Sequence, residues 1–167
     1  MTDSALIQIV DRALEEAAQK SGPHLVCRPG CAECCIGPFE INQLDARRLR
    51  EGLSALERSD PERAARVRER AKKAPGDEEP CPALDPETRT CDLYSWRPMI
   101  CRTFGPAAPS GDGAYSICEL CYTEATEDEI AACAVEFDPE DTESALNDEV
   151  ERETGVIGPT TVASCLR

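Results

Sequence analysis

The amino-acid sequence predicts a mainly α-helical fold: a small single domain of amphipathic helices around an irregular, cysteine-rich, metal-binding middle, with room for one short β-hairpin. The chain has 167 residues, a length that suits one domain with a hydrophobic core. Segments with apolar residues at helical spacing flank a middle that is rich in Cys, Pro and Gly. Only 4% of the residues are aromatic, so aliphatic side chains, helped by a metal, would have to form the core.

We expect this domain to consist of four parts. They are an N-terminal helix in residues 1–22, the first cysteine arm and a helical hairpin in residues 23–75, a Cys/Pro/Gly-rich metal segment in residues 76–125, and C-terminal helices in residues 126–167. The first helix, predicted over residues 4–20, has one apolar stripe, made of Leu6, Val10, Ala13, Leu14 and Ala17. A glycine and a proline then stop it.

Capping residues define the two helices of the hairpin. Asn42 is the expected N-cap of the first, with Asp45 three residues later in a variant of the capping box. Asp60 is the expected N-cap of the second, with Pro61 at its first helical position. We interpret the basic residues of this second helix, within residues 59–76, as a solvated face and not as a nucleic-acid site.

Two further helices are predicted after the metal segment. Thr126 and Glu129 form a capping box, which predicts a short helix. Asp138 is expected to cap the next helix, with Pro139 at its first position and Gly155 at its end. The remaining residues at the C-terminus are expected to add a final turn.

Two stretches of the middle are predicted to be turns or loops. In "LDPETRT", Asp-Pro is followed by polar residues, so this turn could join two short strands and bring Cys81 near Cys91. Residues 105–113 are expected to form a loop. This loop lacks the Gly-Lys-Ser/Thr ending of a phosphate loop, which argues against a nucleotide role.

The charge of the chain argues against two classes of partner. The formal net charge is −15, and such an acidic surface repels nucleic acid and anionic membranes. The N-terminus lacks a basic segment followed by an apolar run, and no stretch approaches the length of a transmembrane helix. We therefore expect a cytoplasmic protein that binds metal ions, without nucleic-acid or membrane partners. The sequence defines no protein partner.

The eleven cysteines are the strongest functional signal. In a reducing compartment, clustered cysteines are more often metal-binding or catalytic than disulfide-bonded, and an odd number cannot pair completely. Cys-x2-Cys spacing, which aims two sulfurs at one metal, joins Cys31 to Cys34 and Cys118 to Cys121. The candidate ligands exceed the four of a single tetrahedral site, so we expect more than one metal. These candidates are Cys27, Cys31, Cys34, Cys35, Cys81, Cys91, Cys101, Cys118 and Cys121.

The adjacent pair Cys34 and Cys35 has three interpretations. One sulfur binds the metal while the other packs in the core, each binds a different metal, or the pair cycles through a vicinal disulfide. Arg97 and Arg102 flank Cys101, where positive charge would offset the negative charge of a thiolate site. Salt bridges to acidic residues would explain these arginines equally well.

Five other residues have simpler interpretations. His24 is the only histidine, and we expect it to be exposed and not to bind the metal. Cys133 and Cys165 are expected to be structural. Tyr94 and Trp96 are expected to cap the metal loop and not to catalyse a reaction.

The cysteine pattern is similar to that of a known family. The stretch "CRPGCAECC" is followed later by "CPALDPETRTCDLYSWRPMICRTFG", in which a turn separates two cysteines, Tyr and Arg-Pro follow, and Cys-Arg comes last. This order resembles the YkgJ-type cysteine-cluster family, which is described as zinc- or iron-chelating, although its first gap is two residues and here it is three. The resemblance covers residues 27–105. It implies a cluster made of Cys31, Cys34, Cys35, Cys81, Cys91 and Cys101, with Cys27 as a further member.

The leading hypothesis is a cytosolic cysteine-cluster protein that binds Zn²⁺ or iron, the latter as an ion or an iron–sulfur cluster, because all-cysteine ligation suits each of them. An iron–sulfur or metal-dependent oxidoreductase or modifying enzyme is the first alternative, and a thiolate metal buffer is the second. We further expect "CRPGCAECC" and residues 81–101 to be the two arms of one site. The helical hairpin would bring sulfurs of the two arms within about 4 Å of each other.

Overall fold

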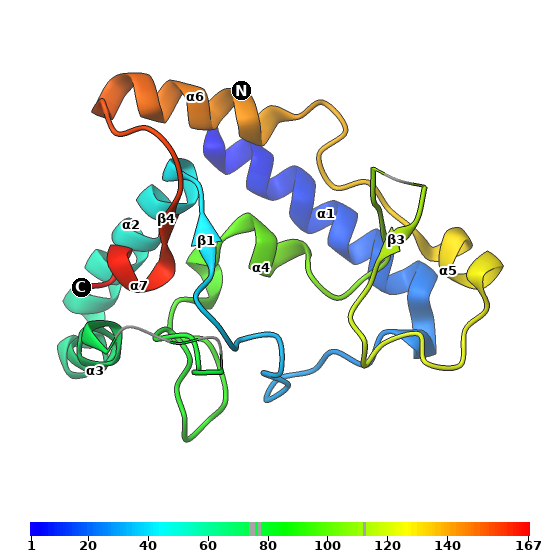
Figure 1. The fold of residues 1–167 in the computed structure, drawn as a ribbon, viewed down its shortest axis with the longest axis horizontal. Helices are drawn as coiled ribbons and strands as arrows, with labels where there is room; N and C mark the ends of the chain where they lie inside the picture. The colour runs from blue at the N-terminus through cyan, green and yellow to red at the C-terminus, as the bar shows by residue number, and fades with distance from the viewer. Residues whose placement is uncertain (74–75, 77, 112) are drawn as a thin grey trace. The chain divides into compact units, whose positions relative to one another are not determined.

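The computed structural model describes residues 1–73, 76, 78–111 and 113–167. Within these residues the chain forms seven α-helices, two 3-10 turns and two pairs of short antiparallel strands, so the predicted mainly helical fold class is confirmed (Figure 1). The chain divides into two compact units, which we describe separately. The first consists of Met1–Arg28 and Thr103–Leu146, and the second of Pro29–Arg102 and Asn147–Arg167. The boundaries predicted within a single domain stay a prediction.

The principal helix of the first unit is α1 (Asp3–Ser21), which confirms the helix predicted over residues 4–20. Thr2 caps its N-terminus by accepting a hydrogen bond from the Ala5 amide. The fully buried residues of its apolar stripe are Leu6, Val10 and Ala17. The 3-10 turn η1 (Gly22–His24) follows directly. None of the helices in the described part of the chain is both long and apolar enough to cross a membrane.

A short β-hairpin in this unit lies where we expected only a loop. β2 (Ala108–Pro109) pairs antiparallel with β3 (Tyr115–Ser116), so the loop prediction for residues 105–113 is wrong for the first of these strands. Residue 112 lies outside the described residues. Each strand is only two residues long, which is too short to leave an alternating pattern in the sequence.

The helix α5 (Glu127–Cys133) begins, as predicted, at a capping box in which Thr126 and Glu129 exchange hydrogen bonds. Its last residue, Cys133, is buried and donates a hydrogen bond to the Lys20 carbonyl (3.3 Å). The core of the first unit contains the buried residues Ala107, Cys118, Cys121, Tyr122 and Cys133. The burial of Cys133 and its bond to the end of α1 agree with the structural role that its sequence context favours, and that role stays a prediction.

The second unit contains the two helices that we predicted between the cysteine arms. α2 (Gln43–Ser59) begins after its N-cap Asn42, and α3 (Pro61–Lys72) begins after its N-cap Asp60. Both helices contribute to one hydrophobic core, through Ala46, Leu49, Leu53, Ala64, Val67 and Ala71. Residues 74 and 75, near the predicted end of the second of these helices, lie outside the described residues.

The C-terminal segment completes the second unit. β4 (Thr160–Thr161) pairs antiparallel with β1 (Glu40–Ile41), and α7 (Val162–Cys165) forms the predicted final turn. The residues that this segment adds to the core of α2 and α3 are Val162, Cys165 and Leu166. The strand pairing joins segments that are far apart in the chain, which is why the local sequence pattern did not predict it.

The helix α6 (Thr142–Thr154) begins later than we predicted. Asp138, with a proline after it, is not directly followed by the helix. Instead, the Asp141 amide donates a hydrogen bond to the Asp138 carbonyl (3.1 Å), and Asp141 adopts a φ of 51° before the helix begins. The Asp138 carboxylate still accepts hydrogen bonds from the first two amides of α6 (3.0 and 2.7 Å). Asp138 thus caps the helix across an intervening turn.

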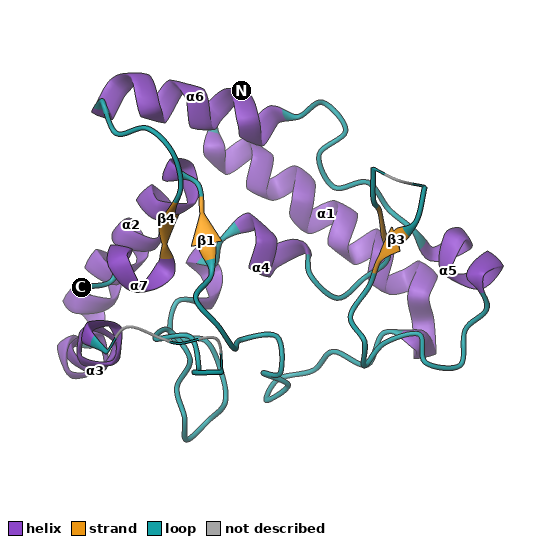
Figure 2. Cartoon of the chain, in the orientation of Figure 1, coloured by secondary structure: helices purple, strands orange, loops and turns teal. Residues whose placement is uncertain are grey.

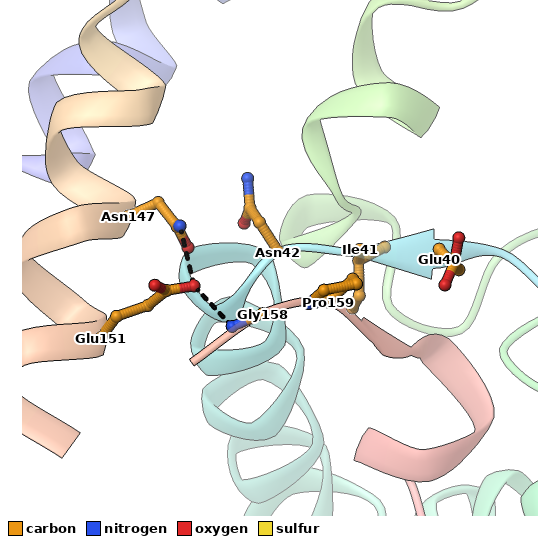
Figure 3. Close-up of a pocket in the computed structure, with 7 residues that line it drawn as sticks. All are labelled: Glu40, Ile41, Asn42, Asn147, Glu151, Gly158 and Pro159. Atoms are coloured by element: carbon orange, nitrogen blue, oxygen red, sulfur yellow. Dashed lines mark hydrogen bonds between the residues drawn. The ribbon is translucent and has the colours of Figure 1, made fainter. Parts of the chain in front are cut away.

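Asn147 on α6 ties this helix to the N-terminus of α2. Its Oδ1 accepts hydrogen bonds from the amides of Gln43 (2.9 Å) and Leu44 (3.2 Å). Its Nδ2 donates to Glu151 (3.2 Å), which also accepts a hydrogen bond from the Gly158 amide (3.0 Å) (Figure 3). These groups belong to a shallow hollow of about 350 Å³ whose lining residues include no cysteine. These hydrogen bonds join Asn147 and Glu151 of α6 to α2 and to the approach to β4. The hollow that these residues line is not part of the cysteine arrangement.

Candidate metal centre

The two predicted cysteine arms meet in the second unit. An antiparallel β-bridge joins Ile36 to Pro80, and next to it the Cys81 amide donates a hydrogen bond to the Cys35 carbonyl (2.8 Å). Apart from the 3-10 turn η2 (Tyr94–Trp96) and the helix that begins at Met99 in the second arm, both arms consist of loops, turns and isolated bridges (Figure 2). "CRPGCAECC" and the later segment are therefore joined at the backbone through two of the candidate ligands themselves.

The turn of the second arm also reaches the first arm. The Asp85 carboxylate accepts hydrogen bonds from the amides of Glu87 (2.8 Å) and Thr88 (3.3 Å), as the Asp-Pro turn chemistry of "LDPETRT" predicts. Arg89, which has a φ of 53°, donates hydrogen bonds to the Glu33 carboxylate (2.8 Å) and to the Gly30 carbonyl (3.1 Å). The turn of the second arm is thus anchored to the loop that carries Cys31 and Cys34.

The hairpin that we expected between Cys81 and Cys91 is formed only in part. A single antiparallel β-bridge joins Leu84 to Cys91, and the Asp92 amide donates a hydrogen bond to the Ala83 carbonyl (2.8 Å). The prediction of two short strands on either side of the turn is therefore wrong for the described residues. The turn nevertheless brings the chain back so that Cys91 lies in the same region as Cys81.

The helix α4 (Met99–Thr103), which the sequence did not predict, carries Cys101 and is held by a buried carboxylate. Both oxygens of Asp45 on α2 accept a hydrogen bond from the Met99 amide (3.0 Å each), and Arg48 forms an ion pair with the same carboxylate. Asp45 and Arg48 are both only 3% exposed. Through this contact α2 fixes the start of the helix that presents Cys101.

Cys34 and Cys35 form a hydrogen bond that affects their two thiols in opposite ways. Because the Cys35 thiol donates to the Cys34 sulfur, the pKa of Cys34 falls to about 6. The same hydrogen bond, together with burial and the nearby sulfurs of Cys81 and Cys91, raises the pKa of Cys35. The hydrogen bond therefore favours the thiolate form of Cys34 and the protonated form of Cys35.

Burial and neighbouring sulfurs raise the pKa values of the other thiols in this region. Burial raises the pKa of Cys81, and it raises the pKa of Cys91 to about 11 with a further contribution from Cys81. Burial also raises the pKa of Cys101 to about 12, with contributions from Cys81 and Cys91. Cys101 as a residue is exposed, so its raised pKa reflects the protein atoms that surround its sulfur on the side facing the other cysteines. The cysteines that influence one another in this way are Cys34, Cys35, Cys81, Cys91 and Cys101.

Cys31 belongs to the same unit but has a local hydrogen-bond partner. Its thiol donates to the Glu33 carboxylate (3.3 Å), and this hydrogen bond, followed by burial, raises the pKa of Cys31. The charge of Cys34 adds to the same shift. Cys31 therefore lies within the electrostatic influence of the group, on the first arm.

The remaining three candidate ligands belong to the first unit. The Cys118 and Cys121 thiols are hydrogen-bonded to each other, and the Cys118 amide donates to the Gly105 carbonyl (3.3 Å). Gly105 has a φ of 119°, and a Cβ atom there would lie only 3.1 Å from the Cys27 sulfur. The close approach of Cys27 thus depends on the absence of a side chain at Gly105. The sequence-predicted ligands therefore divide between the two units.

The donor chemistry of both groups fits a thiophilic metal. Within residues 1–73, 76, 78–111 and 113–167, no three His, Cys, Asp or Glu side chains are arranged as a ready cage for a metal ion. Raised pKa values favour the protonated thiols of Cys81, Cys91 and Cys101, and a hydrogen bond joins the Cys34 and Cys35 sulfurs. Zinc and iron bind thiolates, so a metal would take the place of these protons and of the sulfur–sulfur hydrogen bonds.

Comparison with known families gives the same chemical class. Residues 26–133 match the model of the CxxCxxCC family, which is described as a "putative zinc- or iron-chelating domain". The chain belongs to the CxxCxxCC family. The matched region covers more than half of the chain and contains all of the candidate ligands. The suspected cysteine-cluster family is therefore confirmed, and the chain carries a cysteine-rich domain of the zinc- or iron-chelating class. No curated protein and no solved structure matches the chain.

The structure shows the surroundings of His24, Trp96 and Cys165 in the CxxCxxCC chain, and the expectation for His24 is wrong. His24 is only partly exposed and stacks on the ring of Tyr122 (6.0 Å between centroids, 15° between planes), so its interpretation as a lone exposed side chain is wrong. Trp96 packs against Gly52 of α2, where an added Cβ would lie 2.4 Å from the indole Cγ. Cys165 is buried in the core of the second unit, in agreement with a structural role.

The basic run of the α3 helix is not simply a solvated face. Arg63 and Arg70 both form ion pairs with Asp92 (2.5 Å each), whose side chain is 1% exposed. The sequence did contain a signal for this contact, because positions seven apart lie on one face of a helix. The partner could not be predicted, since Asp92 belongs to an irregular segment that follows Cys91.

Proposed function

We propose that this CxxCxxCC domain binds zinc or iron through two groups of thiolates, one in each unit. The observation that carries the proposal is the hydrogen bond from the Cys81 amide to the Cys35 carbonyl, because it joins the two cysteine arms. The mutual effects of the sulfurs on their pKa values support the same conclusion. A metal would stabilise the irregular arms, which contain little regular secondary structure of their own.

The group in the second unit would provide the principal site. Cys81, Cys91 and Cys101 lie on the second arm, and the first arm would add Cys34, whose lowered pKa favours the thiolate form that a metal requires. These four sulfurs are the number that a tetrahedral zinc or a cubane iron–sulfur cluster takes. Cys31 and Cys35 would become ligands if this unit binds a polynuclear centre.

The group in the first unit would provide a second, smaller site. Cys118 and Cys121 have the spacing of a metal-binding knuckle, and Cys27 approaches the backbone at Gly105, whose carbonyl accepts the Cys118 amide. These three sulfurs leave the fourth position of a tetrahedral metal to another donor. The two groups together account for all nine sequence-predicted ligands and for our expectation of more than one metal.

Zinc and iron, the latter as an ion or an iron–sulfur cluster, are the candidates for the bound species, in line with the zinc- or iron-chelating description of the family. A cytoplasmic location would suit either, since a reducing compartment keeps the thiols available. The buried contacts that hold the segments carrying Cys101 and Cys91 favour a defined metal site over a metal buffer, which needs no such scaffold.

An enzymatic role is the second candidate, and one observation favours it. A hollow of about 330 Å³ is lined by Cys91 together with Gly52, Arg63, Tyr94 and Trp96. A metal bound by Cys91 could therefore be reached by a small molecule if one coordination position is open. Cyanide or imidazole added to the cobalt-loaded protein should then change its ligand-field spectrum, whereas a closed structural site should leave that spectrum unchanged.

Anaerobic cobalt titration of single variants tests the proposed ligands. Cys91→Ser and Cys101→Ser should each abolish or weaken the principal site, because a hydroxyl replaces a thiolate poorly as a ligand. Cys121→Ser should remove the second site and leave the spectrum of the first intact. Cys133→Ala is the matched control, since the Cys133 thiol donates to the Lys20 carbonyl and is not one of the proposed ligands, so its loss should not affect the metal content. Equal metal binding by all four variants would contradict the proposal.

A further inference from the structure

The α3 helix holds the two cysteine-bearing segments of the second arm through one buried carboxylate. Asp92 directly follows Cys91, and its carboxylate accepts hydrogen bonds from Arg63 Nε and Arg70 Nη2 (2.5 Å each). The Nε of Arg70 also donates to the Pro82 carbonyl (2.8 Å). Pro82 directly follows Cys81. One guanidinium therefore links the residue after Cys81 to the residue after Cys91.

We propose that Arg63, Asp92 and Arg70 form a clamp that positions Cys81 and Cys91 for metal binding. None of the three residues is itself a ligand in this proposal. Arg70 fixes the separation of the two cysteines by spanning their neighbouring residues, and Arg63 fixes the orientation of Asp92. The inference rests on the proposed metal-binding function, and it assigns a role within that site to residues outside the cysteine pattern.

The burial of Asp92 distinguishes this clamp from the other ion pairs of α3. The Asp92 side chain is 1% exposed, and those of Arg63 and Arg70 are 35% and 24% exposed. Arg68 on the same helix pairs instead with Glu57, and both of these side chains are well exposed (38% and 40%). A buried carboxylate holds its partners in a defined geometry, whereas an exposed pair contributes little and is screened by water and salt.

The charge of the clamp also suits a thiolate site. Two arginines and one aspartate leave a surplus of one positive charge beside the residues that follow Cys81 and Cys91. A zinc ion with four thiolates has a net charge of about −2, so nearby positive charge stabilises the loaded site. In other metal sites, removal of groups that orient the ligands lowers metal affinity by about 10–100-fold.

The test compares cobalt affinity with the stability of the metal-free protein. We would titrate the full-length wild type, Arg70→Gln, Arg70→Lys, Asp92→Asn and the control Arg68→Gln with Co²⁺ under anaerobic conditions. Urea unfolding of each metal-free variant would be measured in parallel. If Asp92→Asn does not fold, the two Arg70 variants still test the clamp, because Arg70 lies nearer the surface.

The clamp predicts that Arg70→Gln lowers cobalt affinity by about 10–100-fold and alters the ligand-field bands of the bound ion, while Arg68→Gln changes neither. Arg70→Lys should not restore the affinity, because a lysine ammonium cannot span Pro82 and Asp92 as the planar guanidinium does. The clamp would be overturned if Arg70→Gln kept the wild-type cobalt affinity and ligand-field bands, or if Arg70→Lys restored both in full. It would also be overturned if the Arg70 variants lost urea stability without losing cobalt affinity. Each of these results would leave the proposed function intact. A wild type that binds no metal would overturn both.

Discussion

Replacing Asp45 by Asn should destabilise the second unit strongly, because it breaks a buried ion pair. Both Asp45 oxygens accept the Met99 amide, and Arg48 pairs with the same carboxylate. The two side chains are each 4% exposed, so water cannot replace the lost interaction. Breaking such a pair costs about 3–5 kcal/mol, a large part of the roughly 5–15 kcal/mol that stabilises a typical domain.

This cost can be measured as a change in melting temperature. For a chain of this length, 1 kcal/mol corresponds to about 2–4 °C, so Asp45→Asn should lower the Tm by roughly 6–20 °C in a calorimetric or circular-dichroism melt. Asp148→Asn is the matched control, because Asp148 is exposed on α6 and should change stability by no more than about 0.5 kcal/mol. If Asp45→Asn melts within about 2 °C of the wild type, the shift expected for less than about 1 kcal/mol, while the control behaves as expected, the buried pair does not hold α4 as we describe.

Three further predictions concern packing, metal removal and pH. Gly52→Ala should destabilise the protein by about 1–3 kcal/mol and shift the fluorescence of Trp96, the only tryptophan, because the new Cβ would lie 2.4 Å from the indole Cγ. Unchanged emission and stability would contradict this packing. A strong chelator should lower the Tm and expose the second arm to protease, since free metal at about 1,000 times its Kd stabilises the folded state by about 4 kcal/mol. An unchanged Tm after proven metal loss would refute the coupling of metal binding to folding. Zinc affinity should rise as the pH rises from about 6 to about 9, because burial raises the pKa of Cys91 to about 11 and that of Cys101 to about 12, so both thiols must release protons when the metal binds. Calorimetry in buffers of different ionisation enthalpy should detect this release of protons, and identical heats in all buffers would argue against it.

The sequence predicted the helices best where local chemistry determines their ends. Asn42, Asp60 and Thr126 each cap the helix that they were expected to cap, because the capping side chain bonds to an amide only three residues away. The same reasoning failed at Asp138, where the turn before α6 lets the carboxylate cap the helix from farther back. A local rule identified the capping residue there but not the start of the helix.

The parts that escaped prediction depend on contacts between distant segments. β1 pairs with β4, Asp45 holds the Met99 amide, and Asp92 meets two arginines of α3. None of these contacts leaves a periodic pattern in the sequence, because the partners are brought together only by the fold. The cysteine spacing, in contrast, was sufficient to predict the family and the convergence of the two arms at Cys35 and Cys81. The expected approach of their sulfurs to about 4 Å stays a prediction.

Metal analysis of the protein, purified without oxygen and without added metal, tests the central claim most directly. The account predicts bound zinc in a colourless sample, or iron with acid-labile sulfide in a brown sample that absorbs near ~400 nm, as thiolate-ligated iron–sulfur clusters do. In either case Cys91→Ser should reduce the metal content, because Cys91 is one of the thiols brought together in the second unit. A folded wild-type protein that contains no zinc or iron, and that takes up neither when they are supplied under reducing conditions, would contradict the account.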